Sequence, residues 1–209
     1  MSNKEIRIPK QARSIEKKKQ LKQAALILFS EKGFHNTSSN EIAKKAGLSI
    51  GTFYSYFTDK TALYEELVKD LYQDALAQIP DIGLENEDDM IPDPAELIRS
   101  YIQTIMQIHT YMPAFQKEIT SLSQQYEEFR VLEEKYRSYA AEKVLRLLQG
   151  YRKLLRITDF TTAGMIIQNS LEAVVHEVQF YHTSYDKDKV VDELTDMLCR
   201  YVIKAEYLK

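Results

Sequence analysis

Apolar residues recur at spacings of three and four over most of the chain, which is the pattern of amphipathic helices. The first such stretch begins near Ser14, and Gly33 is expected to end it as a left-handed C-cap. Two short helices are predicted after the N-cap candidates Ser38 and Ser49, the first of them ending at Gly47. The N-terminal part is therefore expected to be a compact group of helices.

The remaining pattern predicts a fourth helix up to Pro80, a proline-rich and acidic linker over residues 80–94, and further long helices. With six Gly and five Pro in 209 residues, the chain lacks the many tight turns of a β-sandwich or barrel. We therefore predict an all-α fold. The later helices are expected over residues 94–110, from Pro113 to Gly150, and over 159–182 and 187–207.

Charge is distributed unevenly along the chain. Residues 1–60 carry 12 Lys and Arg against 5 Asp and Glu, whereas residues 61–209 carry 16 against 26. Such a split suggests a small module that meets a polyanion, attached to a larger body that does not. Residues 1–13 lack apolar periodicity and are predicted to be a flexible basic arm.

Several functional classes are disfavoured by what the sequence contains. Its one cysteine, Cys199, allows neither an intrachain disulfide nor a thiolate zinc site. No apolar stretch suggests a signal peptide or a membrane span, so a cytoplasmic protein is expected. We find no phosphate-binding glycine loop, nucleophile elbow or zinc-ligand spacing, and we expect no enzyme activity, cofactor or metal.

Residues 39–58, SNEIAKKAGLSIGTFYSYFT, have the spacing of a helix-turn-helix. Ala43 lies where the two helices would touch, Gly47 lies at the turn, and apolar anchors follow on both sides. The same spacing fits an ordinary helical hairpin, and the spacing alone leaves both interpretations open. The basic residues of this region favour a DNA-binding helix-turn-helix.

The run LFSEKGFHNTSSNEIAKKAGLSIGTFYSYFTDKTAL, residues 28–63, resembles the N-terminal domain of the tetracycline-repressor (TetR) family of bacterial transcription regulators. The shared features include a phenylalanine-x-x-x-glycine step, an alanine-glycine-x-serine turn and a threonine-x-tyrosine-x-tyrosine-phenylalanine recognition helix. The resemblance covers about residues 14–75, whereas residues 80–209 match only as a run of helices. It implies a DNA-binding domain at 14–75 and a ligand-binding and dimerisation domain at 76–209. A homodimer would bind a palindromic operator, and a small-molecule effector would release it.

By position, the resemblance implies that one set of residues meets phosphates or the major groove: Thr37, Ser38, Ser49, Ile50, Gly51, Thr52, Tyr54, Ser55, Tyr56 and Lys60. The charge of Lys60 opposes the helix macrodipole, and a phosphate nearby would compensate that cost. Family members often carry basic residues at the positions of Ile50 and Ser55. Sequence readout here would therefore rest on Thr52, on apolar contact of Ile50 with thymine methyl groups, on DNA shape and on the basic arm. For Tyr56, a half-buried core position is the alternative.

The larger domain offers candidate effector contacts, with apolar and polar members. They are Tyr101, Met106, Met112 and Phe115 as apolar wall, and His109, Asn169, Glu172 and His176 as polar anchors. Glu172 and His176 also fit an intrahelical ion pair, and His109 fits a core histidine. A metal site has too few nameable ligands.

The last predicted helix is apolar around too wide an arc for one partner surface, so we expect the last two helices to form a four-helix contact between subunits. The residues concerned are Val190, Val191, Leu194, Met197, Leu198, Tyr201 and Val202. The function that this reasoning predicts is a ligand-responsive repressor. The alternative is a helical interaction or scaffold module whose basic face binds protein or membrane, and such a module would bind DNA only weakly and without sequence preference.

Overall fold

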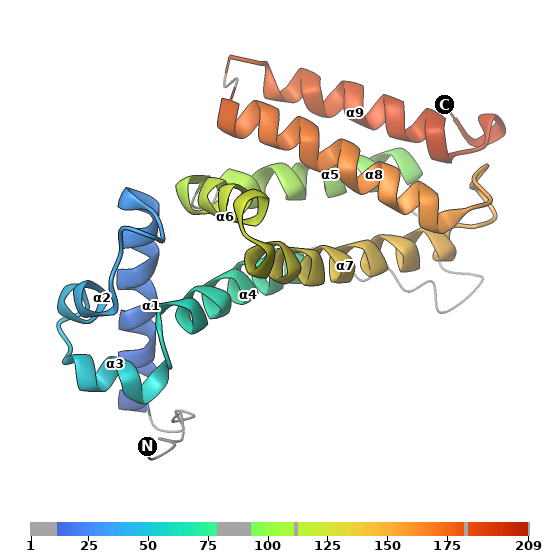
Figure 1. Cartoon of the computed structure of the whole chain (residues 1–209). Coiled ribbons are helices and arrows are strands. Elements are labelled where there is room, and N and C mark those ends of the chain that lie inside the picture. Colours follow the sequence, from blue (N-terminus) through green and yellow to red (C-terminus); the bar gives the residue numbers. More distant parts are fainter. Residues whose placement is uncertain (1–11, 79–92, 111–112, 182–183, 209) are drawn as a thin grey trace. The chain divides into compact units, whose positions relative to one another are not determined.

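The computed structural model describes residues 12–78, 93–110, 113–181 and 184–208 (Figure 1). The described residues are helical apart from short connections and one antiparallel bridge between Leu155 and Ile203. The predicted all-α fold is confirmed. The chain divides into two compact units. Unit 1 contains the described residues up to Gln73 and Ala114–Glu133, and unit 2 contains the described residues from Asp74 to Pro113 and from Glu134 onward.

Unit 1 begins with α1 (Ala12–Lys32), α2 (Ser39–Lys45) and α3 (Ile50–Tyr56), with α2 and α3 beside α1, and continues into α4 (Lys60–Gln78) (Figure 1). Gly33 ends α1 with a φ of 81°, and its amide donates to the Phe29 carbonyl at 3.0 Å. This left-handed cap is the one that the sequence predicted.

The core of unit 1 is an aromatic cluster to which distant parts of the chain contribute. Helix α6 (Pro113–Gln125) and the start of α7 (Glu127–Gly150) supply two of its rings. Ring centroids in this cluster lie 5.1–6.5 Å apart, several of them edge to face, the arrangement that aromatic quadrupoles favour. The rings belong to Phe29, Phe34, Tyr64, Phe115 and Phe129.

Unit 2 is built around α5 (Pro94–Thr110), α8 (Phe160–His176) and α9 (Lys187–Val202), which pack against one another (Figure 1). A π-helical turn, Glu177–Tyr181, continues α8, and a short 3₁₀ turn, Ala205–Tyr207, follows α9. The buried faces of α5, α8 and α9 supply most of the apolar core of this unit.

Two predicted helices have different limits in the structure. The stretch from Pro113 is interrupted at Tyr126, where Glu127 and Glu128 begin a new helix; acidic residues favour a helix N-terminus. The last helix ends at Val202 instead of residue 207. Beyond it the backbone pairs in extended form with the segment that follows α7, since the Lys204 amide donates to the Leu154 carbonyl at 2.9 Å.

Candidate nucleic-acid interface

Each of the two short helices starts with the serine cap that the sequence predicted. Ser38 and Glu41 form a complete capping box at α2, and the Ser49 side chain accepts the Thr52 amide at α3. Between them Gly47 has a φ of 68°, the left-handed conformation required at the turn. Hydrogen bonds from Lys32 first, and then from Ser38, hold the pKa of Glu41 at about 2. The Glu41 carboxylate of this capping box is therefore ionised at neutral pH.

Helix α3 presents one face to solvent. Tyr54 is 47% exposed, Gly51 is exposed, and Ile50, Thr52 and Ser55 are partly exposed. The Thr52 and Ser49 hydroxyls lie 2.9 Å apart, whereas the Ser55 hydroxyl donates to the Gly51 carbonyl at 2.8 Å. This face therefore offers polar atoms and a phenol but no cationic side chain.

The opposite face of α3 is packed into unit 1. Phe53 is fully buried, and Tyr56 is 5% exposed. The Tyr56 hydroxyl lies 2.8 Å from the Ser14 hydroxyl of α1, in a buried hydrogen bond. The structure thus places Tyr56 in the core, which is the alternative that the sequence left open, and joins the end of α3 to the start of α1.

Two further predicted contact residues face inward in this structure. Thr37 is 2% exposed, and its hydroxyl donates to the Gly33 carbonyl at 2.9 Å. The Lys60 ammonium donates to carbonyls of the connection between α1 and α2. The connection is also held from α6, because the Phe34 amide donates to the Glu118 carboxylate at 2.7 Å.

The basic residues of unit 1 fall into two groups. Lys18 and Lys22 pair with Glu66 of α4, and Lys45 pairs with Glu31 of α1. By contrast, no ion pair within the described ranges involves Lys17, Lys19 or Lys44. The basic arm at residues 1–13 lies outside the described residues, apart from Ala12 and Arg13.

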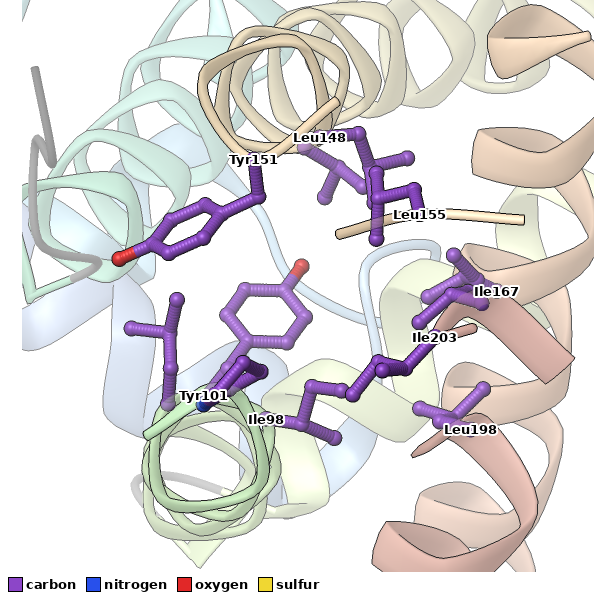
Figure 2. Close-up of a pocket in the computed structure, with 12 residues that line it drawn as sticks. Ile98, Tyr101, Leu148, Tyr151, Leu155, Ile167, Leu198 and Ile203 are labelled. Atoms are coloured by element: carbon purple, nitrogen blue, oxygen red, sulfur yellow. The ribbon is translucent and has the colours of Figure 1, made fainter. Parts of the chain in front are cut away.

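Unit 2 contains an apolar cavity of about 60 Å³ between α5, the end of α7, α8 and α9. Figure 2 shows Tyr101 rising from α5 toward Tyr151, Leu148 and Leu155. None of the described residues that line it carries a charge. The lining residues are Pro94, Leu97, Ile98, Tyr101, Val144, Leu148, Tyr151, Leu155, Ile167, Leu198, Val202 and Ile203.

The structure brings one of the predicted effector contacts to this cavity, Tyr101, and places the other candidates among the described residues elsewhere. Met106 is buried in the core of unit 2, and Phe115 packs against Phe29 and Tyr64 in unit 1. Met112 lies outside the described residues.

The polar candidates form two groups, in which residues of α8 meet Arg137 of α7 and His109 of α5. Arg137 of α7 binds the Glu172 carboxylate at 2.8 Å and donates to the Asn169 side chain at 2.9 Å. The rings of His109 and His176 lie 5.1 Å apart, and Nδ1 of His109 donates to the Ile105 carbonyl at 2.8 Å.

Both histidines are shifted toward the neutral form. Burial lowers the pKa of His109. Burial, followed by repulsion from His109 and Arg137, lowers the pKa of His176 to about 4. They are therefore uncharged rings within unit 2 at neutral pH.

The predicted dimer residues divide between the interior of unit 2 and its surface. Val190 and Tyr201 are partly buried, and Met197 is 46% exposed. The other four belong to the core of unit 2: Val191, Leu194, Leu198 and Val202.

Sequence reasoning missed several residues that build these sites. Ser14 contacts the end of α3 and Glu118 contacts the connection before α2, and the local sequence pattern carries no signal for these contacts between residues distant in the chain. Leu148, Tyr151 and Leu155 line the cavity. The apolar residues on both sides of Gly150 were the available signal for them.

Known proteins resemble both parts of the chain. Residues 21–67 match the family described as bacterial regulatory proteins, tetR family, and residues 93–201 match the tetracyclin repressor-like C-terminal domain. The Bacillus subtilis regulator YdgC, itself uncharacterised, is 37% identical over 75 residues. That match covers 36% of this chain and 38% of YdgC, so the chain spans less than half the length of this relative.

Solved structures share the fold along most of the chain. The SmeT–triclosan complex has a TM-score of 0.75 at 16% identity, covering 93% of this chain and 95% of SmeT, a Stenotrophomonas maltophilia protein. The fatty acid degradation regulator FadR of Bacillus halodurans has a TM-score of 0.71 at 20% identity, covering 91% of this chain and 96% of FadR.

None of the described helices is long and apolar enough to cross a membrane.

The C-terminal family match alone covers more than half of the chain, and the N-terminal match includes both serine-capped helices. The chain therefore belongs to the TetR family of bacterial regulatory proteins.

Proposed function

We propose that this protein is a transcriptional repressor that binds a palindromic operator as a homodimer and releases it when a small apolar effector binds. The observation that carries the proposal is the division of α3 into two faces. Phe53 and Tyr56 fix the helix in unit 1, while Gly51, Thr52 and Tyr54 stay available for a DNA groove. A helix that is packed on one side and exposed on the other is the arrangement by which a helix-turn-helix enters a major groove.

Selection of bound duplexes from random DNA tests operator binding. A symmetric dimer should select a palindrome with half-sites about one helical turn apart, or a multiple of it. The scaffold alternative predicts selected sequences without a consensus, and affinity that follows salt concentration alone. That result would overturn the proposal.

Dimerisation through the last two helices is supported by the apolar residues that they leave exposed. On α8, Met165 and Ile166 are 54% and 39% exposed, and Met197 of α9 is 46% exposed. Large apolar side chains in this number on adjoining helices favour burial against a second copy.

The cavity of unit 2 supports an apolar effector. Its walls are aliphatic and aromatic, so a charged ligand would lose hydration without gaining a partner there. Its volume of about 60 Å³ is smaller than the ~150 Å³ that holds benzene. An effector of that size or larger must therefore widen the cavity, and this movement would provide the switch.

Native mass spectrometry of the purified protein, followed by operator release, tests the effector. A co-purified molecule, or triclosan as a defined probe, should bind the unaltered chain and weaken its operator binding. Val144→Phe fills the cavity and should abolish binding of the probe, whereas Val131→Phe, at an exposed position of the same helix, should not. Release that persists in Val144→Phe would place the effector elsewhere.

A further inference from the structure

The cavity of unit 2 contains a hydroxyl group without a hydrogen-bond partner. Tyr101 is 9% exposed, and no hydrogen bond within the described part of the chain involves its hydroxyl. Figure 2 shows this hydroxyl pointing from α5 into the space between Tyr151, Leu148 and Leu155. A buried hydroxyl without a partner costs stability and is uncommon in native proteins. The apolar walls therefore leave the Tyr101 hydroxyl available to an occupant of the cavity.

A second phenol in the same cavity points in another direction. Tyr151 is 5% exposed, and its hydroxyl is also buried without a hydrogen-bond partner. In Figure 2, however, this hydroxyl points away from that of Tyr101, and the ring of Tyr151 forms a wall. The other described residues that line the cavity are aliphatic. Its centre therefore offers an occupant one polar atom, the Tyr101 hydroxyl oxygen with its proton.

The charges around Tyr101 disfavour an ionised occupant. Burial raises the pKa of Tyr101, and the negative charge of Glu172 raises it further, so the phenol keeps its proton at neutral pH. The Glu172 carboxylate itself is bound by Arg137 at 2.8 Å. An anionic occupant would meet the negative potential of Glu172 and find no cation among the described lining residues. A cationic occupant would lose its hydration and find no carboxylate there.

We propose that Tyr101 sets the chemical class of the effector: a neutral, largely apolar molecule with one oxygen acceptor, such as a ketone or an ester, which accepts a hydrogen bond from the Tyr101 hydroxyl. This inference rests on the proposed function, because it concerns the same cavity. The remainder of the molecule contacts the aliphatic walls. Carboxylate and amidinium compounds of similar shape are rejected because their charge has no partner in the cavity.

Small probes of nearly equal shape separate these classes. Acetophenone is neutral and has a carbonyl oxygen, whereas α-methylstyrene has a CH₂ group in its place. Benzoate is the anionic counterpart, and benzamidine, which is protonated at neutral pH, is the cationic one. Isothermal titration calorimetry in the absence of DNA measures the dissociation constant of each probe for the full-length chain and its variants.

Tyr101→Phe removes the hydroxyl and keeps the ring. Because the hydroxyl has no partner in the structure, the variant should be at least as stable to heat as the unaltered protein. Acetophenone should bind to it roughly 3- to 10-fold more weakly, the loss expected for one neutral hydrogen bond, while α-methylstyrene should bind no more weakly than before. Comparing each probe across the substitution cancels the different hydrophobicity of the two probes.

Tyr139→Phe is the matched control. It removes the same group from a tyrosine of α7 that is 47% exposed and outside the cavity lining, and both probes should bind it as they bind the unaltered chain. Val144→Phe, which fills the cavity, should abolish acetophenone binding and so locates the probe. Benzoate and benzamidine should not displace acetophenone from the unaltered chain.

Several results would overturn the inference. Unchanged acetophenone affinity in Tyr101→Phe, or an equal loss for both neutral probes, would leave the hydroxyl without a role in recognition. A larger loss in Tyr151→Phe would assign the hydrogen bond to the other phenol. Displacement by benzoate or benzamidine would refute the neutral class, and failure of acetophenone to bind the unaltered chain would refute the site. If acetophenone binds as expected but operator affinity stays unchanged, the proposed release of DNA fails and the assignment of Tyr101 stands.

Discussion

Gly51→Ala should stabilise the protein and weaken operator binding. Gly51 is the second residue of α3, and its φ lies outside the left-handed region. A Cβ at this position would meet only the Ser49 hydroxyl oxygen, at 3.8 Å, which is an ordinary contact. No contact with a described residue of unit 1 therefore requires glycine here.

The expected magnitudes follow from helix propensity and from packing. Replacing glycine by alanine in a helix adds about 0.5–1 kcal/mol of stability, which for a chain of this size corresponds to roughly 1–4 °C in melting temperature. Against a groove wall, the added methyl group should cost about 1–3 kcal/mol, or roughly 5- to 150-fold in operator affinity.

Differential scanning calorimetry measures the first effect, and fluorescence anisotropy with the selected operator measures the second. A scrambled duplex is the control, because non-specific binding rests on phosphate charge and should change less. An alanine variant that binds the operator as tightly as the unaltered protein would show that DNA does not approach Gly51 closely. A different face of α3 would then have to lie against the DNA groove.

Thr52→Ala should alter the preference among operator variants while total affinity falls little, which repeated selection from random DNA measures; an unchanged consensus would count against base readout by Thr52. Met197→Glu should yield a folded monomer in sedimentation, whereas Leu198→Glu should unfold unit 2, because Leu198 is 3% exposed in its core; a dimeric Met197→Glu would move the interface elsewhere. Unfolding free energy should fall as pH drops from about 6.5 toward 4. The lowered pKa values of His109 and His176 mean that the unfolded chain binds more protons in this window. Urea titrations at several pH values measure this, and an equally steep fall in His176→Gln would refute the assignment.

The N-terminal helices were predictable because their signals are local. Serine caps, a left-handed glycine and apolar spacing each act within about four residues, and the structure has Ser38, Gly47 and Ser49 in the predicted roles. The role of Tyr56 could not be assigned from the sequence, because its spacing in the helix fits both a DNA contact and a position in the apolar core. Its partner, Ser14, is 42 residues away.

The effector and dimer candidates were harder to predict for a different reason. Helical periodicity identifies a covered face but not what covers it, so Leu198, in the core of unit 2, and the exposed Met197 looked alike. Phe115 was grouped with Met106 by proximity along the chain. After Pro113 the chain contributes to unit 1, a change that spacing cannot reveal.

The aromatic cluster of unit 1 also affects how this protein can be synthesised. The rings of Phe34 and Phe129 lie 5.1 Å apart although 95 positions separate them in the chain. During translation, the aromatic surface of the first three helices therefore stays exposed to solvent until the start of α7 has left the ribosome. A fragment cut after α4 would lack Phe115 and Phe129, and it should be prone to aggregate instead of acting as a portable DNA reader.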